Sequence, residues 1–171
     1  WLIILIVANV LISLKGFSDS SFFDKYKFWT AGIRSGESFR MVSSAFLHVD
    51  YMHLFFNMYA LYLFGDIVVE SLGLVLFILI YIFSLLGGSF LSFSMHKNQA
   101  NYTAVGASGA VSGILYSAVL IYPNMTLMMF PLPIPIPAYI FALGYMIYSI
   151  YGMKKNIGNV GHAAHLGGSI A

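Results

Sequence analysis

Two residues of this 171-residue chain could together carry out nucleophilic chemistry: a serine among glycines and a histidine near the end of the sequence. Ser108 lies in the run 106–109 (GASG), where a long apolar segment begins. If that segment is a helix, its first backbone N–H groups lack intrahelical partners and could stabilise an oxyanion. His165 lies in the run 162–168 (HAAHLGG), which begins another apolar segment. A neutral imidazole there could take a proton from a serine hydroxyl.

Each of these runs also has a plainer interpretation. Gly109 and Gly113 form a small-xxx-small pair, a common device for packing helices in membranes. The run around Ser108 is not the G-x-S-x-G elbow of soluble hydrolases, because Ala110 holds the last position. A single histidine in an apolar setting is commonly hydrogen-bonded between helices. Neither run is decisive alone.

A third polar group lies in the apolar stretch that follows residue 40 and consists of His48, His53 and Asn57. His53 and Asn57 are four residues apart, so they share one face of a helix. Both side chains could donate hydrogen bonds to a developing oxyanion, although bonds between helices are the simpler alternative. His48 lies near the opposite face, and we interpret it as a structural residue bonded to the long first loop.

No acid is well placed to orient the histidine, as a buried aspartate does in soluble serine proteases. Asp50 is the nearest, but it precedes His53 by only one turn. The other five acids lie in the first loop or at the far end of the second apolar stretch: Asp19, Asp24, Glu37, Asp66 and Glu70. The sequence therefore favours a Ser–His dyad.

The composition indicates that lipid surrounds these groups. Hydrophobic residues make up 60% of the chain and charged residues only 8%, against about 25% charged in an average soluble domain. The chain has no cysteine, which excludes disulfides and thiol catalysis. A net charge of +2 gives no reason to expect a nucleic-acid partner. We therefore expect a multi-pass integral membrane protein.

The fold class we expect is all-α: a polytopic membrane helix bundle forming a single domain over residues 1–171. A spanning helix needs about 20 apolar residues, and six stretches approach that length. The expected spans are 1–14, 41–65, 72–93, 104–122, 138–153 and a truncated sixth from 160. Because both ends lie inside apolar runs, we expect the domain to be cut at both ends.

Two segments between these spans have distinct characters. The long first loop, 15–40, is polar but carries several aromatic residues, so it either lies on the membrane surface or is a solvated linker. The segment 123–137 is rich in proline and is expected to break the helix there.

Spans two, four and six begin on the same side of the membrane, which brings the polar groups together. With a rise of about 1.5 Å per residue, His53 would lie roughly 15–18 Å below the start of its span and Ser108 only about 6 Å below its own. We therefore expect the loop 94–103 to dip into the protein, lining a water-filled cavity. All eight basic residues lie on this side, which the positive-inside rule places in the cytoplasm.

The GASG run, the spaced 48–57 cluster and the run 164–168 (AHLGG) together resemble the rhomboid family of intramembrane proteases. The resemblance covers spans two to six, and three motifs at the starts of alternate spans make it specific. It implies a six-transmembrane core without metal or cofactor, in the inner (cell) membrane of a bacterium. It also implies that the substrates are other membrane proteins, cut in or near a transmembrane helix at small residues. The family usually opens its active site to the non-cytoplasmic face, opposite to the side that the basic residues favour.

The residue roles follow from the same resemblance. It implies that Ser108 is the nucleophile and His165 the base, because the pattern Ala-His-x-x-Gly fits His165 rather than the neighbouring His162. The implied oxyanion groups are His53, Asn57 and the Ser108 amide, with Gly106 shaping the approach of the substrate.

Two positions depart from the family pattern. The first loop carries Phe39-Arg40 where the family often has Trp-Arg. Ser112 stands four residues after the nucleophile, where the family often has an aromatic that packs on the catalytic histidine. The sequence therefore leaves open what holds the His165 ring.

Three other functions compete with a protease. A rhomboid-like protein that binds membrane clients without catalysis would usually lack the serine or the histidine, and both are present. A haem or metal membrane protein could use His53 and His165 as facing ligands. A transporter is a weaker alternative, because no repeat relates the two halves of the chain. The oligomeric state is not indicated.

Overall fold

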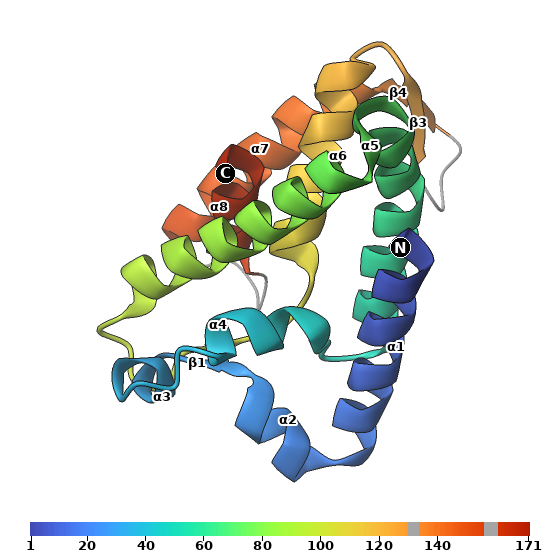
Figure 1. Ribbon diagram of the computed structural model, residues 1–171. Helices are drawn as coiled ribbons and strands as arrows, with labels where there is room; N and C mark the ends of the chain where they lie inside the picture. The colour runs from blue at the N-terminus through green and yellow to red at the C-terminus, as the bar shows by residue number, and fades with distance from the viewer. Residues whose placement is uncertain (130–133, 156–160) are drawn as a thin grey trace.

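The computed structural model describes residues 1–129, 134–155 and 161–171, and the chain is mainly helical in these ranges (Figure 1). The elements, in order, are α1 (Leu2–Ser18), α2 (Ser20–Tyr26), β1 (Phe28–Trp29), α3 (Thr30–Arg34), α4 (Arg40–Ser43), η1 (Ser44–Phe46), α5 (Tyr51–His96), β2 (Thr103–Ala104), α6 (Ser108–Ile121), β3 (Thr126–Met129), β4 (Ile134–Pro137), α7 (Ala138–Lys155) and α8 (His162–Ile170). The strands form two short antiparallel pairs, β1 with β2 and β3 with β4.

Helix α5 begins later and runs further than the sequence indicated. The Asp50 carboxylate accepts a hydrogen bond from the backbone N–H of His53 at 2.7 Å and so caps the helix. The expected start of span two at residue 41 is therefore wrong, because residues 40–46 form the separate helices α4 and η1. Residues 66–71, expected to form a loop between spans two and three, are helical. The helix continues to a break at Gly73, where φ is +81°.

The break at Gly73 divides α5 into a first arm, residues 51–72, and a second arm, residues 74–96. At about 1.5 Å per residue each arm is roughly 33–35 Å long, enough to cross a hydrocarbon core of about 30 Å. Figure 1 shows the arms meeting at an angle. Among the described helices, α5 is the one long and apolar enough to cross a membrane by length and composition, and α1, α6 and residues 138–153 of α7 are shorter apolar helices.

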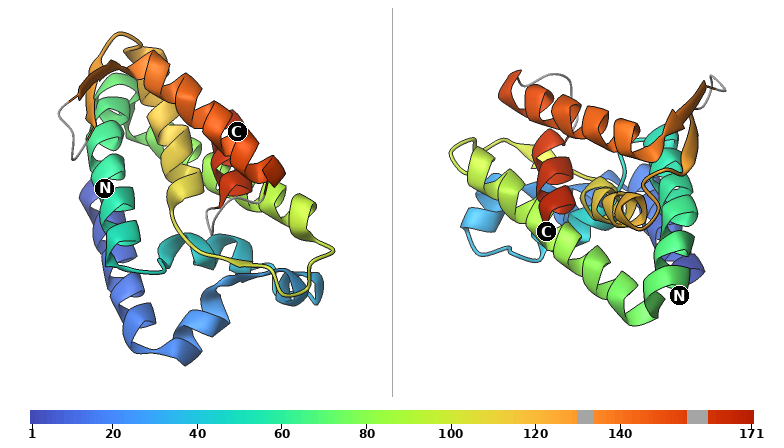
Figure 2. Two further views of the ribbon diagram at one scale, coloured as in Figure 1. Left: turned by 180° about the vertical axis from the view of Figure 1, so that it is seen from behind. Right: turned by 90° about the horizontal axis from the view of Figure 1, so that it is seen from above.

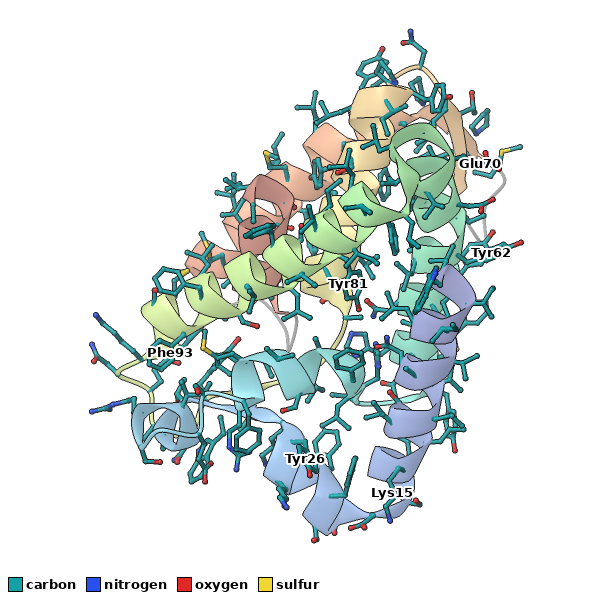
Figure 3. All side chains as sticks on the ribbon, in the orientation of Figure 1. Lys15, Tyr26, Tyr62, Glu70, Tyr81 and Phe93 are labelled. Atoms are coloured by element: carbon teal, nitrogen blue, oxygen red, sulfur yellow. The ribbon has the colours of Figure 1, made fainter. Side chains whose placement is uncertain are left out.

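Large apolar side chains cover the outside of the bundle. In the most apolar window of α5 only 28% of the residues are buried. Ile4, Val75, Leu120 and Ile147, from four different helices, are 61–83% exposed. Tyr62 points outward from the first arm of α5 (Figure 3) and is 52% exposed. Soluble monomers rarely expose such extended apolar surfaces, so this surface fits lipid.

Helix α6 is the centre of the bundle. Seen from above, it lies between the first arm of α5 and α8, with α7 along one side and the second arm along the other (Figure 2). Glycines allow these helices to approach closely. A Cβ on Gly109 would lie 3.2 Å from the Ala164 carbonyl oxygen of α8, and one on Gly88 of the second arm 2.7 Å from the same oxygen. A Cβ on Gly113 would lie 2.8 Å from the Gly168 carbonyl oxygen of α8, so the helix-packing interpretation of Gly109 and Gly113 is confirmed.

The first loop is folded rather than an extended linker. Helix α1 runs to Ser18, beyond the expected end of span one, and the following residues form α2, β1 and α3. Arg40 is buried and holds this segment together. It contacts Glu37 at 2.5 Å and donates to the carbonyls of Asp24 and Lys27 at 2.9 and 3.0 Å. Through the β1–β2 pair the segment reaches the backbone just before Ser108.

Candidate active site

Ser108 is the first residue of α6, and a short strand followed by a turn leads up to it. The expected start of this span at residue 104 is wrong: Thr103–Ala104 form β2, and Gly106 has φ of +130°, which a helix does not accommodate. The Gly106 amide donates to the Ser44 carbonyl at 3.0 Å, which fixes this turn. No side chain caps α6 at Ala107. In the described part of the chain the amides of its first turn are therefore left to bind an oxyanion.

The ring of His53 lies directly against Gly106. A Cβ built on Gly106 would come within 2.7 Å of the His53 Cε1 and 2.9 Å of its Nε2, and 3.7 Å from the Ser108 Oγ. Both His53 and Ser108 lie in the first turn of their helices, so the expected difference in depth between them does not exist. The reason is the late start of α5 at Tyr51, which removes ten residues from the expected span.

Asn57 lies one turn below His53 on the same face, as the spacing predicted. Its side chain is 7% exposed, and its Nδ2 donates to the His53 carbonyl at 2.8 Å. An amide nitrogen has two donors, so one N–H remains for another acceptor. Both residues contribute to the wall of the same cavity as Ser108.

His165 comes to this cavity from α8. The residue is only 8% exposed, and among the described residues its Nδ1 has no hydrogen-bond partner. Gly109, which follows Ser108, packs closely on Ala164, which precedes His165. This contact joins α6 to α8 beside the two candidate catalytic residues. Within the described ranges no direct hydrogen bond joins the two side chains, and such bonds are often long before a substrate binds.

The cavity has a volume of about 1390 Å³. Its wall is built from the first arm of α5, α6, α7, α8 and the segment 99–105. In the described part of the chain no carboxylate lines it, and Asp50, the nearest acid in sequence, caps α5 instead. Nor is there a group of three or more potential metal ligands among the described residues. In the segment before α6, outside the spans, burial raises the pKa of Tyr102 above its ordinary value.

Comparison with known proteins identifies the family. The family model described as "Rhomboid domain" matches residues 35–171. The chain belongs to the rhomboid family.

Individual relatives agree with this membership. The chain is 26% identical to "RHOMBOID-like protein 12, mitochondrial" of Arabidopsis thaliana over 96% of its own length and 54% of that protein. It is 32% identical to "Rhomboid protein 1, mitochondrial" of Saccharomyces cerevisiae over 76% of its length and 38% of the relative. It is 30% identical to "Putative rhomboid protease YdcA" of Bacillus subtilis over 56% of its length and 48% of the relative.

The lengths of these relatives limit what family membership establishes about the activity of the whole protein. The chain spans only about half the length of these proteins or less. The family is membrane-integral, and it includes serine proteases that act on membrane proteins. Two of the three relatives are mitochondrial by name, so they do not support the expected bacterial inner membrane.

His48 is structural in this rhomboid domain, but its partners differ from the expected ones. Its Nδ1 lies 2.9 Å from the Ser13 Oγ of α1, and its Nε2 accepts from the Ala107 amide at 3.4 Å. The Ser13 hydroxyl donates to the Phe46 carbonyl at 3.0 Å. These bonds agree with a proton on Nδ1. The expectation that His48 binds the long first loop is therefore wrong: it ties α1 to the residue before Ser108.

Sequence reasoning missed the residue that packs on the His165 ring. Tyr145 of α7 stacks on it, with ring centroids 5.5 Å apart and planes at 29°. Ser112 leaves room for this ring, and its Oγ lies 3.5 Å from the Tyr145 hydroxyl. His162, the alternative base, packs on Tyr148, with ring centroids 5.0 Å apart. No pattern in the sequence distinguishes Tyr145 from the other tyrosines of α7.

Proposed function

We propose that this protein is an intramembrane serine endopeptidase that cleaves transmembrane segments of other membrane proteins with a dyad of Ser108 and His165. The observation that carries the proposal is the composition of one cavity wall. It brings together Ser108 at the N-terminus of α6, His53 and Asn57 from α5 and His165 from α8, and no described carboxylate lines it. Membership of the rhomboid family supports the same reaction class.

The mechanism follows from the position of each group. The Ser108 Oγ attacks the scissile carbonyl carbon while His165 takes the hydroxyl proton. The carbonyl oxygen becomes an oxyanion, which the first amides of α6 and the side chains of His53 and Asn57 stabilise. His165 then gives its proton to the leaving amine as the C–N bond breaks. His165 then takes a proton from a water molecule, which attacks the acyl carbon; the bond to the Ser108 Oγ breaks, the Oγ receives the proton from His165, and the acid product is released.

Substrate access is supported by the position of the cavity. Its wall follows the first arm of α5 down to Ile67 and continues along α7 from Phe141 to Met153. The lining between these helices is largely apolar, as a transmembrane segment requires. We propose that a substrate helix enters sideways between the first arm and α7 and unwinds at Ser108.

The membrane core that we propose has six spans. They are α1, the two arms of α5, α6, α7 and α8, and they form a single domain over residues 1–171. In this arrangement the basic loops and the mouth of the cavity lie on the same side, because Lys27 and the segment 99–105 contribute to its lining.

The deciding experiment uses the protein in proteoliposomes with a panel of transmembrane substrates and a fluorophosphonate probe. Ser108→Ala and His165→Ala should each abolish cleavage, and Ser108→Ala should also abolish labelling. Ser117→Ala is the matched control, because Ser117 lies on the same helix but not in the cavity wall. His162→Ala should retain cleavage if His165 is the base.

Three results would reject the proposal. Cleavage or labelling that persists in Ser108→Ala would remove the nucleophile. A folded wild-type protein that binds transmembrane segments but neither cleaves them nor reacts with the probe would be a client-binding rhomboid-like protein. A visible absorption spectrum with a Soret band would instead indicate haem held by the histidines.

Loss of one oxyanion donor, as in Asn57→Ala, should slow cleavage by up to about 10²–10³-fold.

A further inference from the structure

The orientation of the His165 ring has no polar determinant in the described part of the chain. Its Nδ1 has no hydrogen-bond partner there, and no described carboxylate lines the cavity. An imidazole without such a partner can turn about its side-chain torsions. A base must nevertheless present one ring nitrogen to the serine hydroxyl within hydrogen-bond reach. Packing against neighbouring rings is therefore the remaining way to fix it.

Tyr145 provides the nearest parallel surface. Its ring lies 5.5 Å from that of His165 at an angle of 29°, whereas the His162 ring is 6.2 Å away and nearly perpendicular. Offset stacking at this separation is a favourable aromatic geometry. The Tyr145 ring covers one face of the imidazole but not its edge, where the two ring nitrogens lie. Tyr145 also contributes to the cavity wall, beside the reacting groups.

Tyr145 is itself held in place from two sides. The Phe141 ring, one turn earlier in α7, lies parallel to it at 6.1 Å and 5°. On the other side the Tyr145 hydroxyl reaches Ser112, whose Oγ donates to the Ser108 carbonyl at 2.7 Å. The Tyr116 hydroxyl of α6 donates to the Ala142 carbonyl of α7 at 2.7 Å, which fastens the two helices together nearby.

We propose that Tyr145 is the positioning residue for the base: its ring, delivered from α7, holds the His165 imidazole in the orientation that accepts the Ser108 proton. The inference rests on the proposed protease function. It makes α7 part of the catalytic arrangement as well as one side of the substrate path. A displacement of α7 would withdraw the ring and release the base.

The test compares substitutions at Tyr145 in the full chain in proteoliposomes. Tyr145→Phe keeps the ring and loses only the 3.5 Å contact with Ser112, so it should keep kcat close to wild type. Tyr145→Leu removes the ring and should lower kcat by about tenfold to a hundredfold, as small misplacements of catalytic groups do, with KM little changed. Tyr151→Leu is the matched control, because Tyr151 lies on the same helix and is 55% exposed.

An activity-independent measurement separates this inference from the proposed function. In protein with isotope-labelled histidine, the Tyr145 ring current should shift the His165 ring signals, which His165→Ala identifies. Tyr145→Leu should remove this shift and Tyr145→Phe should keep it. Melting temperatures in detergent show whether each variant folds, and Tyr145→Met replaces the leucine variant if it does not.

The outcomes are distinct. Wild-type kcat in folded Tyr145→Leu, with cleavage still dependent on Ser108, overturns the positioning role and leaves the protease intact. Equal loss in Tyr145→Phe and Tyr145→Leu also overturns it, because the ring would then not be the cause. An inactive wild type rejects the protease, and the His165 signals then decide whether Tyr145 orients the ring.

Discussion

Gly106→Ala should be among the most damaging single-methyl changes in this protein. Gly106 has φ of +130°, a backbone conformation that residues with a Cβ rarely adopt, and its new methyl group would lie 2.7 Å from the His53 Cε1. Backbone strain of this kind costs about 1–3 kcal/mol. Overlap with a packed side chain costs about a further 1–3 kcal/mol unless the neighbour moves.

The neighbour that must move is a proposed oxyanion donor. The added methyl would push the His53 ring away from Gly106, and the ring cannot then hold the position it has beside Ser108. Loss of one donor slows acyl transfer by about 10²–10³-fold in a soluble serine protease. We therefore expect Gly106→Ala to reduce cleavage by at least about a hundredfold and to lower the melting temperature.

Two other glycines of the chain separate these effects. Gly36 also has positive φ, +106°, but its Cβ would meet nothing within 4 Å. Gly36→Ala should lower the melting temperature and keep cleavage near wild type. Gly144 on α7 has neither feature, so Gly144→Ala should change neither quantity appreciably.

The assay is Ser108-dependent cleavage of a transmembrane substrate in proteoliposomes, with melting measured in detergent on the same preparations. Wild-type cleavage by Gly106→Ala would refute the placement of His53 against this glycine. Equal loss of cleavage in Gly36→Ala and Gly106→Ala would show that the effect is general destabilisation rather than displacement of His53.

Three further substitutions follow from contacts around the site. Asp50→Ala removes the cap of α5, so it should cost about 1 kcal/mol of stability and reduce cleavage. Asp50→Asn keeps the cap and should keep both stability and cleavage near wild type. Loss of cleavage in a stable Asp50→Asn variant would instead argue for a catalytic triad. Gly168→Ala places a methyl against the Gly109 backbone and should lower the melting temperature by an amount equivalent to about 1–3 kcal/mol; an unchanged melting curve would contradict the close packing of α6 on α8. Ser13→Ala removes the hydroxyl beside the His48 Nδ1 and should cost about 1 kcal/mol in thermal unfolding, and no loss there would show that His48 does not tie α1 to the site.

The sequence located the candidate site better than it located the helices that carry it. Residue type and spacing, together with the resemblance to rhomboid proteases, predict His53, Asn57, Ser108 and His165, and all four line one cavity. Their catalytic roles stay predictions. The start of α5, by contrast, was misplaced by ten residues, because most of residues 41–49 are apolar and hydropathy alone continues the span. A helix begins where its first amides find a cap, and Asp50 provides it.

What the sequence determined by itself is the solvent and the chemistry. A chain that is 60% hydrophobic and 8% charged must be covered largely by lipid, and polar residues retained in it are costly enough to mark a site. What only the tertiary structure decided is how the site is held together. Tyr145 reaches His165 from a different helix, and His48 reaches Ser13 of α1. Such pairings depend on which faces of the helices meet. The local sequence pattern does not predict these faces, because lipid-facing and core-facing residues are equally apolar.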